Sequence, residues 1–184
     1  QRQIAHTTAR VGQPKATSAA AAMQALNPDI RIDAIETRAD AALLDRLLPT
    51  AQVVLDCCDN FSTRQAVNAA CVRHRVPLVS GAVIRMDGQL SVYDSRDLAS
   101  PCYACLFPPD QAPEEVRCAT LGVLAPLVGV IGTLQATEAV KLLSGIGSAL
   151  PGRLQMLDGR RLEWNEMRFA RQPGCPVCGG RHAP

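Results

Sequence analysis

The sequence lacks any long run of basic residues. It contains 19 Lys and Arg against 17 Asp and Glu, and the two signs are interspersed, so the formal charge is only +2. A protein that neutralises many nucleic-acid phosphates needs a continuous basic surface. We therefore do not expect nucleic acid as a partner.

The sequence also lacks the marks of a membrane or secreted protein. It shows no charged and then apolar leader, and no clean apolar span of about 20 residues. The nearest approach, residues 121–134, contains Pro126 and continues into Gln135, Glu138 and Lys141, as expected of a buried or interface helix. Of eight cysteines, four form two C-x-x-C pairs and others lie in apolar segments, which indicates metal binding and core packing rather than disulfides. We expect a cytoplasmic protein.

The length allows one substantial hydrophobic core. With 184 residues, 47% of them hydrophobic, we expect a single domain over residues 1–184. The first residue is Gln1, and neither a strand nor a helix cap precedes it. We therefore expect the chain to be truncated at its N-terminus.

The hydrophobic pattern alternates between strands and helices. Helices are expected from Pro14 at the first helical position to Leu26, after a cap at Asp40, and after a capping box of Ser62 and Gln65. Strands are expected over residues 30–35, 53–55 and 77–83. This order predicts an α/β fold, with a parallel sheet covered by helices on both faces. Beyond Gly88 the pattern changes to a strand over 89–93, an irregular stretch, a long helix to about Leu143 and two short strands near 154–157 and 162–168.

Acidic residues follow the strand at 53–55, in the run Asp56-Cys57-Cys58-Asp59-Asn60. Ligands of parallel sheets bind beyond the carboxyl ends of the strands. Asp59, with its neighbours, could hold Mg²⁺ and a nucleotide triphosphate, because Mg²⁺ is commonly bound by one or two carboxylates together with phosphates. The alternative is that Asp59 and Asn60 only form the turn and cap the next helix. Arg2 and Lys15 are likewise either ordinary solvated cations or part of the same pocket.

The two C-x-x-C pairs have the spacing of two halves of a zinc site. Turn-forming Pro and Gly residues flank them. Two redox motifs are the alternative, but a redox C-x-x-C normally opens a helix after a strand, and neither pair is expected to do so. The sequence therefore predicts one structural Zn²⁺, closed to catalysis because all four ligands are thiolates. These ligands are Cys102, Cys105, Cys175 and Cys178.

The remaining cysteines are assigned from their neighbours. Cys118 lies near Arg117, whose charge would favour a thiolate, although a buried inert thiol is equally consistent with its position. Cys57, Cys58 and Cys71 are assigned to the core. In the long helix, Gly129-x-x-Gly132 allows close backbone approach to a neighbour, which is weak support for a dimer.

Taken together, the motifs resemble the ThiF/MoeB/HesA family, and they match it in order and spacing over essentially the whole chain. They are Gln-Arg-Gln-Ile at residues 1–4, Val-Gly-Gln-Pro-Lys at 11–15, Asp-Cys-Cys-Asp-Asn at 56–60, Pro-Leu-Val-Ser-Gly-Ala at 77–82, the two C-x-x-C pairs, and Gly-Val-Leu-Ala-Pro-Leu-Val-Gly at 122–129. The resemblance implies a Rossmann-like, mostly parallel sheet with a C-terminal antiparallel extension and a tail clipped by zinc.

The resemblance also implies the site residues. Arg2 and Lys15 would contact ATP phosphates, and Asp59 would bind Mg²⁺. Gln1, Gln3 and Asn60 would line the nucleotide pocket. The family's strand, Gly-rich turn and ribose-binding acidic residue would all lie before Gln1, so we expect the chain alone to be inactive.

The implied activity is adenylation of the C-terminal glycine carboxylate of a ubiquitin-like sulfur carrier ending in Gly-Gly. Residues 79–89 look closer to the branch that serves the molybdopterin synthase small subunit, with the thiamine-pathway carrier as second choice. A homodimer is implied, together with a sulfur donor such as a cysteine desulfurase or rhodanese. Cys118 is a candidate covalent acceptor. The competing hypothesis is a non-catalytic partner or scaffold subunit that docks a carrier without activating it, and an NAD-dependent dehydrogenase is disfavoured because no acid/base pair for hydride transfer is evident.

Overall fold

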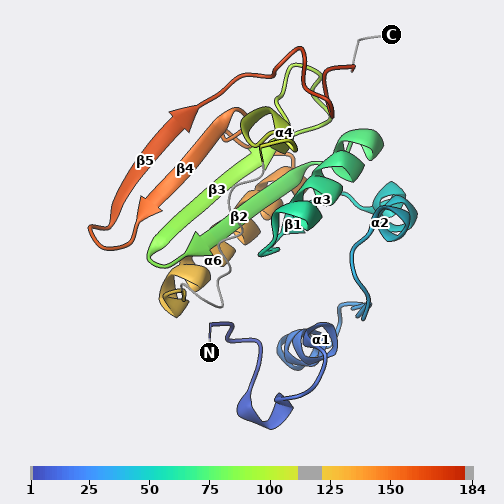
Figure 1. Cartoon of the computed structure of the whole chain (residues 1–184). Coiled ribbons are helices and arrows are strands. Elements are labelled where there is room, and N and C mark those ends of the chain that lie inside the picture. Colours follow the sequence, from blue (N-terminus) through green and yellow to red (C-terminus); the bar gives the residue numbers. More distant parts are fainter. Residues whose placement is uncertain (1, 112–121, 181–184) are drawn as a thin grey trace. The chain divides into compact units, whose positions relative to one another are not determined.

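The computed structural model describes residues 2–111 and 122–180 (Figure 1). The chain divides into two compact units, Gln1–Arg38 and Ala39–Pro184, each held together by its own internal contacts. The single domain expected over residues 1–184 stays a prediction.

The first unit contains a short 3-10 helix, η1 (Thr8–Arg10), and the helix α1 (Lys15–Leu26). Pro14 is the N-cap of α1, one residue before the position expected for it. Ser18 connects these elements, because its hydroxyl oxygen lies 2.8 Å from Nδ1 of His6 and its carbonyl accepts the Arg10 guanidinium at 2.5 Å. The unit thus places Lys15 at the first position of a well-anchored helix.

Residues 30–35 form no strand, so that prediction is wrong. Ile30 is 43% exposed and Ile35 is 38% exposed, and the segment pairs with none of the strands of the described sheet. β-branched residues stabilise a strand only where a neighbouring strand completes the hydrogen-bond ladder and one face is covered. Here neither condition is met.

The second unit is built on a five-stranded sheet of order β1-β2-β3-β4-β5. Its first pair, β1 and β2, is parallel, and the other three pairings are antiparallel. The predicted α/β class is confirmed, and the antiparallel extension, which begins at β3, makes up most of the described sheet, so the described strands form a mixed sheet and not a mostly parallel one. The strands are β1 (Val54–Asp56), β2 (Leu78–Ile84), β3 (Asp87–Tyr93), β4 (Arg153–Asp158) and β5 (Glu163–Arg168).

Helices cover both faces of this sheet, as the sequence predicted. In β2, Leu78 belongs to a core cluster with Val67 of α3 (Phe61–His74), whereas the next residue, Val79, belongs to a different cluster with Leu142 of α6 (Ala125–Leu143). Successive side chains of a strand point to opposite faces. The helices α3 and α6 therefore lie on opposite sides of β2 (Figure 1).

The helix α3 begins after Asn60 and not after Ser62. The Oδ1 atom of Asn60 accepts the backbone N–H of Thr63 at 2.9 Å and the hydroxyl of Ser62 at 3.0 Å. The predicted capping box of Ser62 and Gln65 is therefore wrong, and Ser62 lies in the first turn. Both residue types are good caps, and the sequence pattern alone did not choose between positions two apart.

The other helix ends follow their sequence signals. Asp40 caps α2 (Ala41–Leu47), as predicted, by accepting the N–H of Leu43 at 2.8 Å, and η2 (Leu48–Thr50) continues it. The left-handed residue Arg75, with φ of 55°, ends α3. A four-residue helix, α4 (Tyr103–Leu106), lies within the stretch expected to be irregular.

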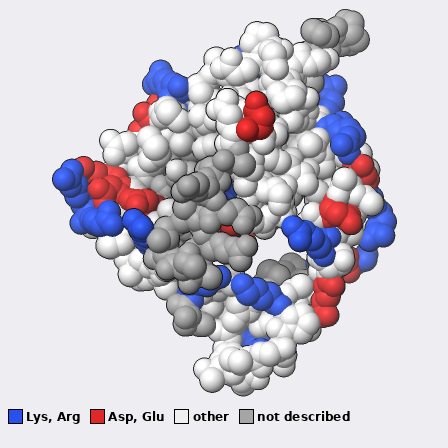
Figure 2. Space-filling model, in the orientation of Figure 1, with Lys and Arg blue, Asp and Glu red and all other residues white. Residues whose placement is uncertain are grey.

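The surface carries charge of both signs. On the face shown in Figure 2, basic and acidic side chains are interspersed, and the described residues show no continuous basic field there. No helix within the described part of the chain is long and apolar enough to cross a membrane.

Candidate functional site

Two carboxylates at the end of β1, Asp56 and Asp59, are close in sequence but lie in different environments. Asp56, which is 2% exposed, uses both carboxylate oxygens internally: Oδ1 accepts the N–H of Cys58 at 2.8 Å, and Oδ2 pairs with the Arg64 guanidinium at 3.2 Å. Both carboxylate oxygens of Asp56 are therefore occupied by contacts that stabilise the turn.

Asp59 has the opposite environment. It is exposed, and no other residue in the described ranges makes a hydrogen bond or ion pair with its side chain. Asn60, beside it, accepts the N–H of Thr63 as the cap of α3. The alternative that this turn caps the next helix is thus confirmed for Asn60. The Asp59 carboxylate, in contrast, remains available to a ligand at the carboxyl end of β1.

Two cysteines of this turn do not belong to the core. Cys57 is exposed and Cys58 is half-buried, so their assignment was wrong, whereas Cys71 is buried as predicted. Partial burial, followed by the charge of Asp56, raises the pKa of Cys57 and raises that of Cys58 to about 12. Both remain protonated thiols at neutral pH, which argues against nucleophilic use.

The other predicted nucleotide residues belong to the first unit. Arg2 and Gln3 are exposed near the start of the chain, and Lys15 is exposed at the first position of α1. Their convergence with Asp59 and Asn60 on one nucleotide stays a prediction. Gln1 and Cys118 lie outside the described residues.

The two C-x-x-C pairs come together as predicted. All four sulfur atoms lie within 4.8 Å of one another, with separations of 3.7 Å between Cys102 and Cys175 and 3.4 Å between Cys105 and Cys178. Four thiolates at about 2.3 Å from a tetrahedral Zn²⁺ lie about 3.8 Å apart, whereas a disulfide needs about 2 Å. The spacing therefore fits a closed zinc site.

The local structure aims these sulfurs at one point. Cys102 is the N-cap of α4, so the first pair does open a short helix, contrary to expectation, although a loop and not a strand precedes it. In the tail, the N–H of Gly179 donates to the carbonyl of Cys175 at 2.8 Å. A Cβ on Gly179 would lie 2.5 Å from two backbone carbonyl oxygens, so this turn requires glycine.

Hydrogen-bond donors surround the cluster. The Cys102 thiol, and then the backbone N–H groups of Gln172 and Cys102, lower the pKa of Cys105 to about 4, which favours the thiolate that a metal binds. Asn68 of α3, 1% exposed, donates from Nδ2 to the Cys102 sulfur at 3.7 Å. Its Oδ1 accepts the N–H of Tyr103 at 3.0 Å, and because a backbone N–H can only donate, this bond fixes the amide with its NH₂ group toward the sulfur.

The sequence analysis missed three polar residues that organise these sites: Arg64, Asn68 and Gln135. Arg64 and Asn68 share a face of α3 with the buried Val67 and Cys71, and Gln135 lies among the buried residues of α6. A polar residue at helical spacing within an apolar stripe was the available signal, because such residues must find partners when buried.

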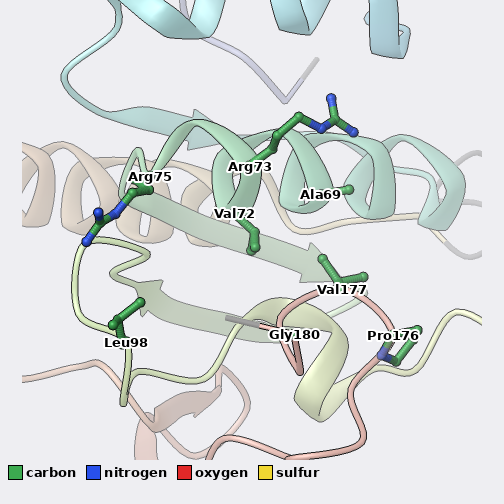
Figure 3. Close-up of a pocket in the computed structure, with 8 residues that line it drawn as sticks. All are labelled: Ala69, Val72, Arg73, Arg75, Leu98, Pro176, Val177 and Gly180. Carbon is green, nitrogen blue, oxygen red and sulfur yellow. The ribbon is translucent and has the colours of Figure 1, made fainter. Parts of the chain in front are cut away.

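A cavity of about 570 Å³ lies between the second half of α3 and the cysteine tail (Figure 3). Its two guanidinium groups extend in opposite directions, and both have partners: Arg73 pairs with Asp45, and Arg75 donates to the carbonyl of Arg96 at 3.3 Å. None of the predicted site residues lines it. Its lining residues are Ala69, Val72, Arg73, Arg75, Leu98, Pro176, Val177 and Gly180.

Known proteins resemble this chain in fold and in sequence. A crystal structure titled "Crystal structure of E. coli MccB + ATP" superposes with a TM-score of 0.79 at 20% identity, covering 97% of this chain and 54% of that chain, which shows a common fold. The chain is 45% identical over 182 residues to the molybdopterin-synthase adenylyltransferase of Escherichia coli K12, covering 97% of this chain and 71% of the relative. It is 44% identical over 183 residues to the sulfur carrier protein ThiS adenylyltransferase of the same strain, covering 100% of this chain and 72% of the relative.

The family model described as "ThiF family" matches residues 1–177, which include the exposed Asp59 and the first three cysteines of the cluster. The matched range spans both units of the structure. The similar proteins from Escherichia coli are named adenylyltransferases. The chain belongs to the ThiF family.

Proposed function

We propose that the protein containing this chain uses ATP to adenylate the C-terminal glycine carboxylate of a ubiquitin-like sulfur carrier ending in Gly-Gly. The names of the similar Escherichia coli proteins support this activity. The observation that carries the assignment to this chain is the exposed carboxylate of Asp59, presented at the carboxyl end of β1 by a turn whose other acid is fully bonded.

In the proposed reaction, a carrier carboxylate oxygen attacks the α-phosphorus of ATP. The bond from that phosphorus to the oxygen bridging to the β-phosphate breaks, which gives the carrier acyl-adenylate and pyrophosphate. Asp59 would hold Mg²⁺, which when bound offsets phosphate charge. Arg2 and Lys15 would stabilise the charge that develops on the nonbridging oxygens.

The position of Lys15 supports its role. A helix N-terminus carries unsatisfied N–H groups and a partial positive charge, so a lysine there is unfavourable for the helix itself. Lys15 is exposed at the first position of α1, and no side chain caps that end. A phosphate group would satisfy both the lysine and the free N–H groups.

The cysteine cluster would hold one structural Zn²⁺. The four sulfurs have tetrahedral spacing, and hydrogen-bond donors reach two of them. With all four positions filled by Cys102, Cys105, Cys175 and Cys178, the metal would clip the tail to α4 and its N-cap and would leave no coordination site for a substrate.

The partners follow from the same proposal. We prefer the molybdopterin synthase small subunit as the carrier, on the pattern of residues 79–89, with the thiamine-pathway carrier second. A sulfur donor such as a cysteine desulfurase or rhodanese would convert the adenylate to a thiocarboxylate, with Cys118 as a candidate acceptor in that later step.

A homodimer is supported by the apolar exposed residues of α6, among them Val130, Val140 and Leu143 at 41%, 63% and 52% exposure.

Pyrophosphate exchange in the intact protein with a purified carrier tests the proposal. Wild type should exchange only with carrier, ATP and Mg²⁺ present, and Asp59→Ala should lose the activity while keeping its fold by circular dichroism. Equal exchange by wild type and Asp59→Ala would refute the metal role of Asp59. No exchange by the intact wild type with either carrier would favour the scaffold hypothesis instead.

A further inference from the structure

Arg64 is largely buried, unlike Arg73 of the same helix, whose side chain is 51% exposed. The Arg64 side chain is 11% exposed, and its guanidinium reaches four groups. It pairs with Asp56 at 3.2 Å, and it donates to the Ser80 hydroxyl at 3.0 Å, to the Gly81 carbonyl at 2.9 Å and to the Cys58 carbonyl. One side chain thus joins the end of β1, the following turn and β2.

Gln135 holds the same turn from the other face of the sheet. Its Nε2 donates to the carbonyl of Asp56 at 2.9 Å and to that of Val79 at 3.2 Å, and its Oε1 lies 3.6 Å from the Cys57 sulfur. Gly81 makes room for it, because a Cβ there would lie 2.4 Å from the Gln135 side chain. The turn is therefore fixed from α3 on one side and from α6 on the other.

These contacts restrict the backbone on both sides of Asp59. Before it, Gln135 holds the carbonyl of residue 56, Asp56 holds the N–H of Cys58, and Arg64 holds the carbonyl of Cys58. After it, Asn60 is tied to the N–H of Thr63. The Asp59 side chain makes no hydrogen bond or ion pair with another described residue, so the restraint acts on its backbone and leaves the carboxylate open.

We propose that Arg64 is a positioning residue for adenylation, which holds the turn so that the Asp59 carboxylate meets the magnesium ion of the bound nucleotide. Arg64, Asp56 and Gln135 together form a clamp on the turn. The inference rests on the proposed role of Asp59 in binding Mg²⁺. Asp56 contributes by neutralising Arg64, because a buried unpaired charge would be costly.

We expect loss of the clamp to weaken the apparent affinity for Mg²⁺ more than it lowers the maximal rate. When only a fraction of the molecules presents a competent site, the apparent dissociation constant rises by the inverse of that fraction. If loss of the clamp leaves about one molecule in ten with Asp59 correctly placed, the Mg²⁺ concentration at half-maximal exchange rises about tenfold. A purely structural arginine would instead reduce the amount of folded enzyme and leave that midpoint unchanged.

The test measures pyrophosphate exchange against Mg²⁺ concentration in the intact protein with its carrier. Arg64→Gln should raise the midpoint about tenfold, with much of the rate recovered at saturating Mg²⁺, and Arg64→Lys should show a smaller rise because it keeps the pairing with Asp56. Arg73→Gln is the matched control: this residue of the same helix is 51% exposed, makes its ion pair with Asp45 and should keep the wild-type midpoint.

The outcomes separate the clamp from the proposed function. Should Arg64→Gln fail to fold, Gln135→Met removes the opposite arm and should raise the midpoint in the same direction. A wild-type midpoint in every folded variant of Arg64 and Gln135, together with lost exchange in Asp59→Ala, would overturn the positioning role alone. Unchanged exchange in Asp59→Ala would instead overturn the metal role on which the inference rests.

Discussion

Replacing Cys175 by serine should destabilise the second unit, because it opens a cross-link between distant parts of the chain. Cys175 is 6% exposed, and its sulfur lies 3.7 Å from that of Cys102. Between the two C-x-x-C pairs the chain forms a loop of about 70 residues, and closing such a loop is worth on the order of 4 kcal/mol. A serine hydroxyl is a poor zinc ligand, so most of this stabilisation should be lost.

The local core adds to the effect. Cys102, Cys175 and Cys178 form a small buried cluster with Val72 and Ala104, and Val177 packs against it. Once the tail detaches, this cluster opens to solvent. For a protein of 150–250 residues each kcal/mol corresponds to roughly 2–4 °C in the melting temperature, so Cys175→Ser should melt roughly 8–16 °C below wild type.

The assay combines zinc analysis with thermal melting of the intact protein. Wild type should contain one zinc per chain, and Cys175→Ser should contain less than one and melt earlier. Cys57→Ser, at an exposed thiol outside the cluster, should match wild type in zinc content. A wild type without zinc, or a Cys175→Ser protein with full zinc and an unchanged melting temperature, would refute the reasoning.

Three further outcomes are expected. Asn68→Leu removes the N–H that donates to the Cys102 sulfur and should weaken zinc binding by roughly 10–100-fold, as measured by competition with a chelator. An unchanged zinc affinity would mean that this hydrogen bond does not contribute to metal binding. Cys118→Ala should leave zinc content, melting temperature and pyrophosphate exchange unchanged and affect at most a later sulfur-transfer step, so loss of exchange would contradict its assignment. Light scattering should show the intact protein as a dimer at micromolar concentration, and Val140→Glu, at a position 63% exposed on α6, should shift it toward monomer; a monomeric wild type would disprove the dimer.

The parts of the fold that local patterns determine were predictable. The long helix ends at Leu143 and β2 covers Leu78–Ile84, close to the expected boundaries. Both elements are buried against each other, so their apolar spacing reflects a real environment. The isoleucines at 30–35 show the limit, because the same residue types without a neighbouring strand form none.

The sequence predicted that the four cysteines gather at one place, but it did not predict the side chains that hold the two candidate sites in position. The C-x-x-C spacing identified the four cysteines because such pairs are common ligands of a tetrahedral metal. The family resemblance already favoured Asp59 over Asp56, and the tertiary structure adds a physical reason, since Arg64 pairs with the buried Asp56 whereas Asp59 is exposed. Long-range hydrogen bonds such as that from Gln135 to the carbonyl of Asp56 have no local sequence pattern.

The helix α3 connects the two sites through one face. Asn60 caps it beside Asp59, Arg64 holds the turn one helical turn later, and Asn68 contacts the cysteine cluster one turn after that. Residues four apart lie on the same side of a helix, so these three side chains form a single polar row within an otherwise apolar face. An apolar residue at position 64 or 68 would leave the Asp56 Oδ2 atom without its ion pair or the Tyr103 N–H without its acceptor. The polar row therefore links the turn that carries Asp59 to the cysteine cluster, and the packing of the helix alone does not require it.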